Sequence, residues 1–132
     1  MNFQLQRNDQ TTVINLTTEF INFYYSTLNS KNFNNILPYL KPYTIFSAQK
    51  IRYEGNKILN YFEILKNINA TFTNIDYDTM HSGSRRINVL VTGIINYTEN
   101  NIQTTKNFSE YIHFGNDSDG VLWIQTLMFK II

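Results

Sequence analysis

Four side chains in strand-like stretches have the chemistry of a general acid or base: Asp76, Asp78, His81 and His113. Side chains alternate between the two faces of a strand, so a strand over residues 74–81 places both aspartates on one face and His81 on the other. A general base must lie within hydrogen-bond reach of its target and have a tuned pKa. Because these groups do not converge, we predict no catalytic residues and no enzymatic activity.

The strand around His113 carries one further carboxylate. Ser109, Tyr111 and His113 share one predicted face, and Glu110 points to the opposite face. With no carboxylate beside it on its own face, His113 is interpreted as an ordinary strand residue.

A short acidic segment resembles the start of a calcium-binding loop. It is NDSDG, residues 116–120, with Asp117, Asp119 and Gly120 at suitable spacing. An EF-hand loop also requires a glutamate at its twelfth position, and counting from Asp117 that position is Met128. We therefore predict a hairpin turn here, with no metal and no cofactor.

The composition excludes several classes of protein. The chain has 132 residues, a formal net charge of +1 and no cysteine, which excludes disulfides and thiol chemistry. We see no basic stripe for nucleic acid, no membrane-spanning run and no signal peptide. We predict an intracellular protein with a flexible leader at residues 1–10 and one domain at residues 11–132.

The segment EFINFYYSTLN, residues 19–29, belongs to a helix that is apolar over much of its circumference. At 100° per residue, the apolar side chains between residues 13 and 28 cover an arc of about 200°, whereas a surface helix needs a stripe of only about 100°. Such a helix must contact protein on two sides. A curved sheet together with a second helix would satisfy it.

The remaining pattern predicts the other elements. A second helix covers about residues 31–40 and ends at Pro42, two short strands follow, and a third helix lies in NKILNYFEILKNI. Four strand-like runs then alternate with short turns: TFTNIDYDTMHS, RINVLVTGIINYT, KNFSEYIHFG and GVLWIQTLMFKII. The sequence therefore predicts an α+β domain with three helices on one face of a strongly curved antiparallel sheet that ends in a four-strand meander.

The last strand is apolar on both predicted faces. One face carries Val121, Trp123, Leu127, Phe129 and Ile131, and the other carries Leu122, Ile124, Met128 and Ile132. A sheet that is covered on one side only should alternate apolar with polar residues. We therefore predict a homodimer packed sheet to sheet through Val121, Trp123 and Leu127.

The order of these elements, together with EFINFYYSTLN, YEGNKI, VTGII and FSEYIHF…LMFK, resembles the nuclear transport factor 2-like family. The matching features are Phe20, Tyr24 and Tyr25 in the first helix, Gly55 before the third, and Met128-Phe129-Lys130 at the close. The resemblance covers about residues 11–132. It implies a cone-shaped, cystatin-like fold in which a curved sheet surrounds a long helix, commonly as a dimer.

The resemblance is to the transport and scaffold branch of that family. It implies a binding module in nucleocytoplasmic transport, including messenger-RNA transport, that holds Phe-Gly or other phenylalanine-containing segments, such as those of nucleoporins. The positions that match a known peptide slot are Phe20, Tyr39 and Phe129. The alternative is that all three are ordinary core residues. Cytoplasm and nucleus would be its location.

Other family activities fit the sequence less well. The positions that match Ran-binding acidic residues are Gln49, Thr98 and Asn100, with only Glu99 acidic nearby, so we do not expect Ran binding. Gln49 also lies where isomerase-like members carry a catalytic carboxylate, and an amide cannot abstract a proton. A ketosteroid isomerase-like cavity enzyme or small-ligand binder, and a heterodimer partner of a messenger-RNA export receptor, stay open as alternatives.

Overall fold

The computed structural model describes residues 3–4, 10–82, 86–116 and 120–132. Its helices are α1 (Gln10–Ser30), the 3-10 helices η1 (Phe33–Tyr39) and η2 (Gly55–Lys57), and α2 (Ile58–Asn67). Its strands are β1 (Leu40–Ala48), β2 (Ile51–Glu54), β3 (Thr71–Ser82), β4 (Arg86–Glu99), β5 (Ile102–Asn116) and β6 (Leu122–Ile131). They form one sheet in the order β2-β1-β6-β5-β4-β3, antiparallel except between β1 and β6.

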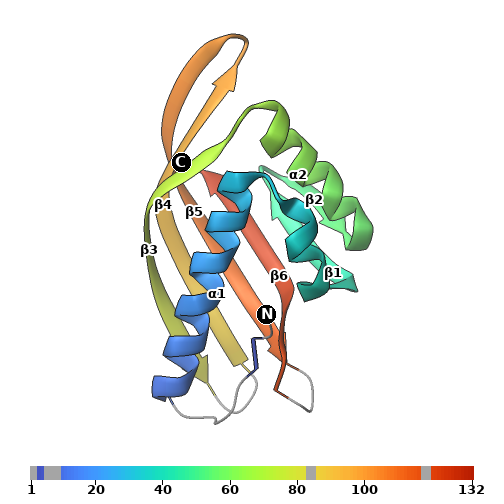
Figure 1. Ribbon diagram of the computed structural model, residues 1–132, viewed down its shortest axis with the longest axis vertical. Coiled ribbons are helices and arrows are strands. Elements are labelled where there is room, and N and C mark those ends of the chain that lie inside the picture. The colour runs from blue at the N-terminus through green and yellow to red at the C-terminus, as the bar shows by residue number, and fades with distance from the viewer. Residues whose placement is uncertain (1–2, 5–9, 83–85, 117–119) are drawn as a thin grey trace.

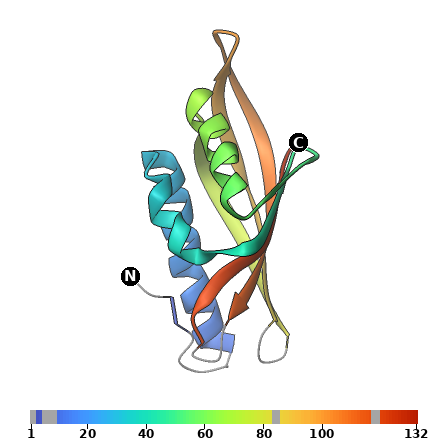
Figure 2. The same ribbon diagram turned by 90° about the vertical axis from the view of Figure 1, so that its right-hand side faces the viewer.

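The helices all lie on one face of a curved, open sheet, and the long β4–β5 hairpin extends past the end of the helical layer (Figures 1 and 2). The predicted α+β architecture is therefore confirmed. Below, the inner face is the one that carries the helices and the outer face is the one that they leave open. In the part of the chain that the structure describes, no helix combines the length and apolar content needed to span a bilayer.

Helix α1 contacts protein on two sides, as its wide apolar arc predicts. The ring of Phe20 lies 4.8 Å from that of Phe114 on β5 and 5.8 Å from that of Tyr39 on η1. Phe20 and Tyr24 have no exposed surface. The sheet and the second helix thus bury this face together, which explains why so many aromatic side chains are needed in one helix.

The connection around Gly55 differs in detail from the prediction. The second helix ends at Tyr39, and Pro42, expected to terminate it, lies inside β1 between Leu40 and Ile45, where the register against β6 shifts. Gly55 has a φ of +59°, and a Cβ atom there would lie 2.7 Å from the carbonyl oxygen of Pro42. Only glycine avoids both the unfavourable φ and this clash.

A bulge in β6 changes which of its residues share a face, so the assignment predicted from the sequence is wrong for part of this strand. His113 pairs with Thr126 and Phe114 pairs with Ile124, so Gln125 is the extra residue and the alternation changes phase there. Leu127 is consequently fully buried on the inner face, while Trp123 remains on the outer face. The sequence prediction that Trp123 and Leu127 share one face is wrong, because strict alternation does not survive a bulge.

The first described residues are part of the fold. Phe3 has no exposed surface, its carbonyl oxygen accepts a hydrogen bond from the N–H of Leu122 at 2.8 Å, and Gln4 forms a bridge with Val121. Gln10, which we assigned to a flexible leader, begins α1. Residues 1–2 and 5–9 of that leader lie outside the described residues.

Candidate functional site

An aromatic slot lies where α1, η1 and the start of β6 meet. Its walls are Phe20 and Phe23 from α1 and Tyr39 from η1, and the ring of Phe3 lies between them. The centroid of the Phe3 ring is 5.1 Å from that of Phe20, 5.3 Å from Tyr39 and 5.4 Å from Phe23. We call this arrangement the Phe slot.

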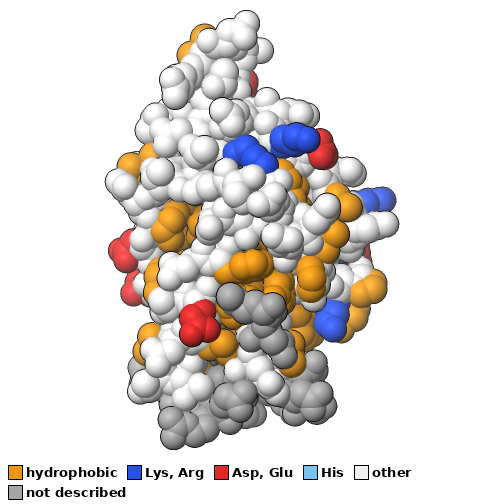
Figure 3. Space-filling view, in the orientation of Figure 1, with side chains coloured by type: hydrophobic (Ala, Val, Ile, Leu, Met, Phe, Trp, Pro, Cys, Tyr) orange, Lys and Arg blue, Asp and Glu red, His pale blue; other side chains and the backbone are white. Residues whose placement is uncertain are grey.

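The local sequence explains why the slot forms. Phe20 and Phe23 are three positions apart on α1, so their rings lie on neighbouring parts of one helix face. Tyr39 is the last residue of η1 and packs edge-on against both, at 5.8 Å and 5.4 Å. Apolar side chains gather at the surface between α1 and η1 (Figure 3). Phe23 on α1 is half-buried and Leu37 on η1 is exposed.

Beside the slot, the start of β6 has a strand edge that β1 does not cover. Pairing between β1 and β6 starts at Leu40 and Ile124, so the preceding residues of β6 have no β1 partner on that side. Residues 3–4 occupy this edge through the Leu122 hydrogen bond and the bridge to Val121. Figure 1 shows residues 3–4, in dark blue, beside the beginning of β6.

Of the three residues that the sequence assigns to a peptide slot, the structure brings two together. Phe20 and Tyr39 are walls of the Phe slot, whereas Phe129 lies against Phe108 at 5.7 Å and Tyr61 at 6.2 Å, elsewhere in the core. The sequence prediction missed Phe3 and Phe23. The spacing of Phe23 from Phe20 could have indicated it, but the polar surroundings of Phe3 give no such signal.

A group of buried polar side chains lies between the helices and the inner face of the sheet. The hydroxyl of Tyr25 donates a hydrogen bond to Oε1 of Glu110, which is almost completely buried on the inner face of β5. The other carboxyl oxygen of Glu110 and the hydroxyls of Tyr24 and Tyr61 are buried without a hydrogen-bond partner. Burial raises the pKa of Glu110 to about 8, although the Tyr25 hydrogen bond opposes this effect.

Among these buried side chains, the raised pKa keeps the carboxyl of Glu110 protonated at neutral pH. Among the described residues, no side chain beside it can act as a base. Burial raises the pKa of Tyr24 and of Tyr61 well above the ordinary value, and the charge that Glu110 carries once it ionises raises both further. A neutral carboxyl beside tyrosine hydroxyls can donate hydrogen bonds to an oxyanion. Glu110 lines none of the four cavities described, and Gln49, at the expected carboxylate position, accepts a hydrogen bond from the N–H of Ile131.

The other acid–base candidates lie apart from this group. Asp76 and Asp78 are exposed on β3, and His113 lies on β5 with β4 between them. His113 and the hydroxyl of Tyr111 both make hydrogen bonds to the side-chain oxygen of Asn88. Within the described ranges, no cluster of three His, Asp or Glu side chains could hold a metal ion, and Asp117 and Asp119 lie outside those ranges.

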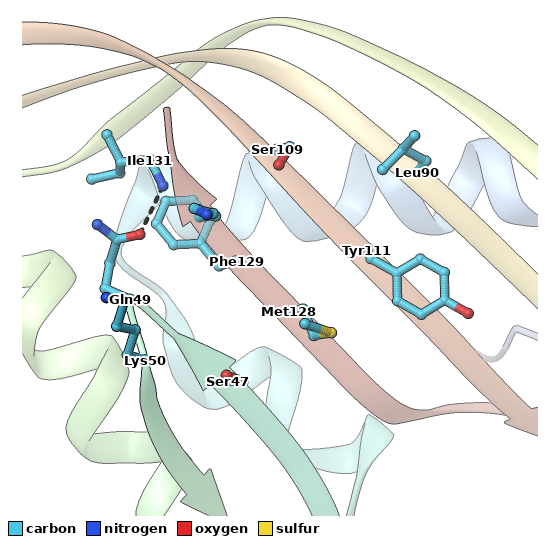
Figure 4. A pocket seen from close by; sticks show the side chains of 10 residues that line it. Ser47, Gln49, Lys50, Leu90, Ser109, Tyr111, Met128, Phe129 and Ile131 are labelled. Atoms are coloured by element: carbon cyan, nitrogen blue, oxygen red, sulfur yellow. Dashed lines mark hydrogen bonds between the residues drawn. The ribbon is translucent and has the colours of Figure 1, made fainter.

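The outer face carries an exposed apolar row across three strands. Leu90 on β4, Tyr111 on β5 and Met128 on β6 are direct cross-strand neighbours. Leu90 is 51% exposed and Met128 is 54% exposed. They line a shallow depression of about 460 Å³ (Figure 4), in which Tyr111 and Met128 lie side by side and Gln49 is at the far end. We call these three residues the outer row.

Trp123, predicted to contact a second subunit, already has partners within the chain. Its ring meets Tyr43 edge-on at 5.4 Å, and the ammonium of Lys41 lies 5.9 Å from its centroid. It also covers Gly115, where a Cβ atom would lie 2.5 Å from the ring. Trp123 and Val121 are half-buried on the outer face, at one end of the strand that carries Met128.

No protein-family model and no curated protein matches this chain. Solved structures do match. Nuclear transport factor 2 from Cryptosporidium parvum superposes with a TM-score of 0.72 and 21% identity, covering 87% of this chain and 90% of that one. The CaMKII hub of S. rosetta gives a TM-score of 0.72 and 10% identity, covering 88% and 94%.

An enzyme-like relative of the fold matches as well. A ketosteroid isomerase-like protein from Erwinia carotovora atroseptica superposes with a TM-score of 0.68 and 9% identity, covering 83% of this chain and 88% of that one. At these identities the similarity establishes the architecture and leaves the activity open. The chain therefore has the nuclear transport factor 2-like fold.

Proposed function

We propose that this chain is a non-enzymatic binding module that pairs with a second copy through its outer face and holds a phenylalanine-containing segment in the Phe slot. The observation that carries the proposal is the ring of Phe3, which lies fully buried between the three aromatic walls. Edge-to-face aromatic pairs add about 0.5–1.5 kcal/mol beyond simple burial, so these walls favour a phenylalanine over an aliphatic side chain of similar size.

A single phenylalanine in such a slot binds weakly. Two slots in a dimer, facing a partner that repeats the motif, raise the overall affinity because the second contact is intramolecular. The proposed ligand is therefore a flexible segment with several phenylalanines, such as a Phe-Gly repeat.

The occupant proposed for the outer face is a second copy of this chain. Tyrosine and methionine are enriched at protein interfaces, and the outer row presents both beside Leu90. A second row of cross-strand neighbours lies beside the outer row. It consists of Asp76 on β3, Thr92 on β4, Ser109 on β5 and Lys130 on β6. A two-fold axis parallel to the strands, between β4 and β5, would place Asp76 of one copy opposite Lys130 of the partner subunit. Asp76 and Lys130 would thus form a complementary pair of charges across this axis.

The narrower form of the proposal is a role in nucleocytoplasmic transport, with nucleoporin Phe-Gly segments as ligands, or in a related messenger-RNA scaffold, in the cytoplasm and nucleus. It is supported by the sequence motifs of the first helix and by the likeness to nuclear transport factor 2 from Cryptosporidium parvum, at 21% identity. Ran is left out of the proposal, because Gln49, Thr98 and Asn100 are neutral.

Titration of a synthetic peptide with two Phe-Gly repeats into isotope-labelled protein tests the proposal. We expect NMR shift changes that centre on Phe20, Phe23 and Tyr39, and none with a peptide in which serine replaces phenylalanine. The variant Phe23→Ala removes a half-exposed wall and should weaken the response. Shift changes that spare the Phe slot, or no changes at millimolar peptide, would remove the proposed ligand.

A second candidate function is a small-ligand site inside the cone, and the buried Glu110 favours it. Its carboxyl, with Tyr24 and Tyr61, would donate hydrogen bonds to a carbonyl or enolate oxygen. Catalysis would also require a base and room for a substrate, and Gln49 supplies no base. A steroid-sized ligand that binds the wild-type chain and loses affinity in Glu110→Gln would favour this candidate over the Phe slot.

A further inference from the structure

We infer that the segment carrying Phe3 is an internal competitor for the Phe slot, so that an external phenylalanine ligand binds only when this segment leaves. The inference rests on the proposed function, because it concerns the regulation of the same slot. The walls of the slot belong to helices, whereas its occupant, Phe3, belongs to no helix or named strand.

The walls of the slot are fixed by contacts that do not involve Phe3. Phe20 packs against Phe114 on β5 at 4.8 Å, and Phe23 packs against Tyr39 at 5.4 Å. Both phenylalanines belong to a helix of 21 residues, and Tyr39 ends η1 next to β1. Departure of Phe3 would therefore leave a preformed site that has the size of one phenylalanine side chain.

The occupant is attached more lightly. Phe3 and Gln4 belong to no helix or named strand, and Gln4 forms an isolated bridge with Val121, just before β6. A segment of this kind opens at a lower free energy than the helices and strands around it. The described contacts that hold it include the buried ring of Phe3 and the hydrogen bond from the N–H of Leu122 to the carbonyl oxygen of Phe3.

These two contacts also define what a competing ligand must offer. It needs a phenylalanine ring for the slot and, at the same residue, a carbonyl oxygen for the N–H of Leu122, because a buried N–H without a partner is costly. An extended segment meets both conditions by adding to the free edge of β6. A helical segment does not, since its carbonyl oxygens are already bonded within the helix.

Competition lowers the apparent affinity for every external ligand. The apparent Kd equals the intrinsic Kd divided by the fraction of molecules whose slot is open. A tethered competitor acts at an effective concentration of roughly millimolar order, so it excludes weak single motifs more than repeated ones. The slot would thus respond to partners that present many phenylalanines.

The test uses the full chain carrying Phe3→Ala and a synthetic peptide of residues 1–8, MNFQLQRN. We expect this peptide to bind Phe3→Ala at least about tenfold more tightly than it binds the wild-type chain, because the slot is then open. NMR shift changes should centre on Phe20, Phe23 and Tyr39. The same peptide with alanine in place of its phenylalanine should not bind.

A matched control separates opening of the slot from general loosening of the fold. Phe33, the first residue of η1, is also a buried phenylalanine, but its ring stacks on that of Phe62 on α2, at 5.1 Å. Phe33→Ala removes the same atoms without emptying the slot. It should bind MNFQLQRN as weakly as the wild-type chain does.

The outcomes distinguish the inference from the proposed function. Equal affinity of Phe3→Ala and wild type for MNFQLQRN, or no binding to Phe3→Ala at millimolar peptide, would overturn the internal competitor. A Phe-Gly peptide that binds both proteins equally would overturn it too and leave the proposed function standing. If MNFQLQRN binds Phe3→Ala but the Phe-Gly peptide does not, the inference is supported and the proposed Phe-Gly ligand is wrong.

Discussion

The two faces of strand β5 differ in almost every physical respect. Phe108, Glu110, Ile112 and Phe114 point inward and have almost no exposed surface, whereas Tyr111 points outward. The inner face is packed with aromatic rings, and it also carries Glu110, the one acidic or basic side chain that is buried among the described residues. The outer face keeps an exposed apolar row, with an acidic group at Asp76 on β3 and a basic group at Lys130 on β6. One strand thus contributes one face to the core, while its other face keeps apolar side chains exposed.

The largest expected effect comes from the charge on the inner face. The folded-state pKa of Glu110 is raised to about 8, above the ordinary 4.5, so the folded state favours the protonated form. Its contribution to stability is complete below pH 4.5 and is lost as the pH rises through 8. At about 1.4 kcal/mol per pH unit, the loss is on the order of 5 kcal/mol.

Urea unfolding of wild type and Glu110→Gln at pH 5, 7 and 9 measures this effect. The wild-type chain should lose stability with rising pH, and the variant, which stays neutral, should lose much less. Glu99→Gln, at the exposed end of β4, is the control and should follow the wild-type chain. Parallel profiles for wild type and Glu110→Gln would show that the buried carboxyl does not distinguish the two faces.

A matched pair on β5 compares packing on the two faces. Phe108→Ala should destabilise the chain by about 3–5 kcal/mol, because the ring packs against Phe72 at 5.2 Å and has no exposed surface. Tyr111→Ala, three positions away on the outer row, should change stability by less than about 1 kcal/mol at concentrations too low for pairing. Chemical denaturation of both variants at low protein concentration checks the comparison, and similar losses would contradict it.

A smaller effect concerns the charges of Asp76 on β3 and Lys130 on β6, on the outer face. Asp76→Lys should weaken pairing by roughly 0.5–1 kcal/mol, a two- to fivefold increase in the dimer Kd, because Lys130 of the partner subunit then faces a like charge. The double variant Asp76→Lys with Lys130→Asp should recover most of the affinity. Additive losses in the double variant would contradict the proposed two-fold axis. Analytical ultracentrifugation over a concentration series measures all three proteins.

Much of the fold was predictable, because the helix period of α1 and the alternation in the strands are local patterns. The bulge at Gln125 was not, since the sequence shows only a long apolar run, and this misplaced Leu127. Phe3 was missed because the aromatic rings that it contacts lie 17 or more positions along the chain, so no local pattern links them to it. Glu110 could have been found: it is the one carboxylate on the strand face that also carries Phe108, Ile112 and Phe114, and such a residue is buried when the face is buried.

Sedimentation equilibrium of the wild-type chain and of the double variant Leu90→Asp, Met128→Asp tests the difference between the faces most directly. We expect a wild-type dimer at micromolar concentration, and a variant that is monomeric with an unchanged circular dichroism spectrum. A wild-type chain that stays monomeric at about 100 μM would show that the outer face does not pair with a second copy. It would also favour a heterodimer, in which a different protein covers Leu90 and Met128.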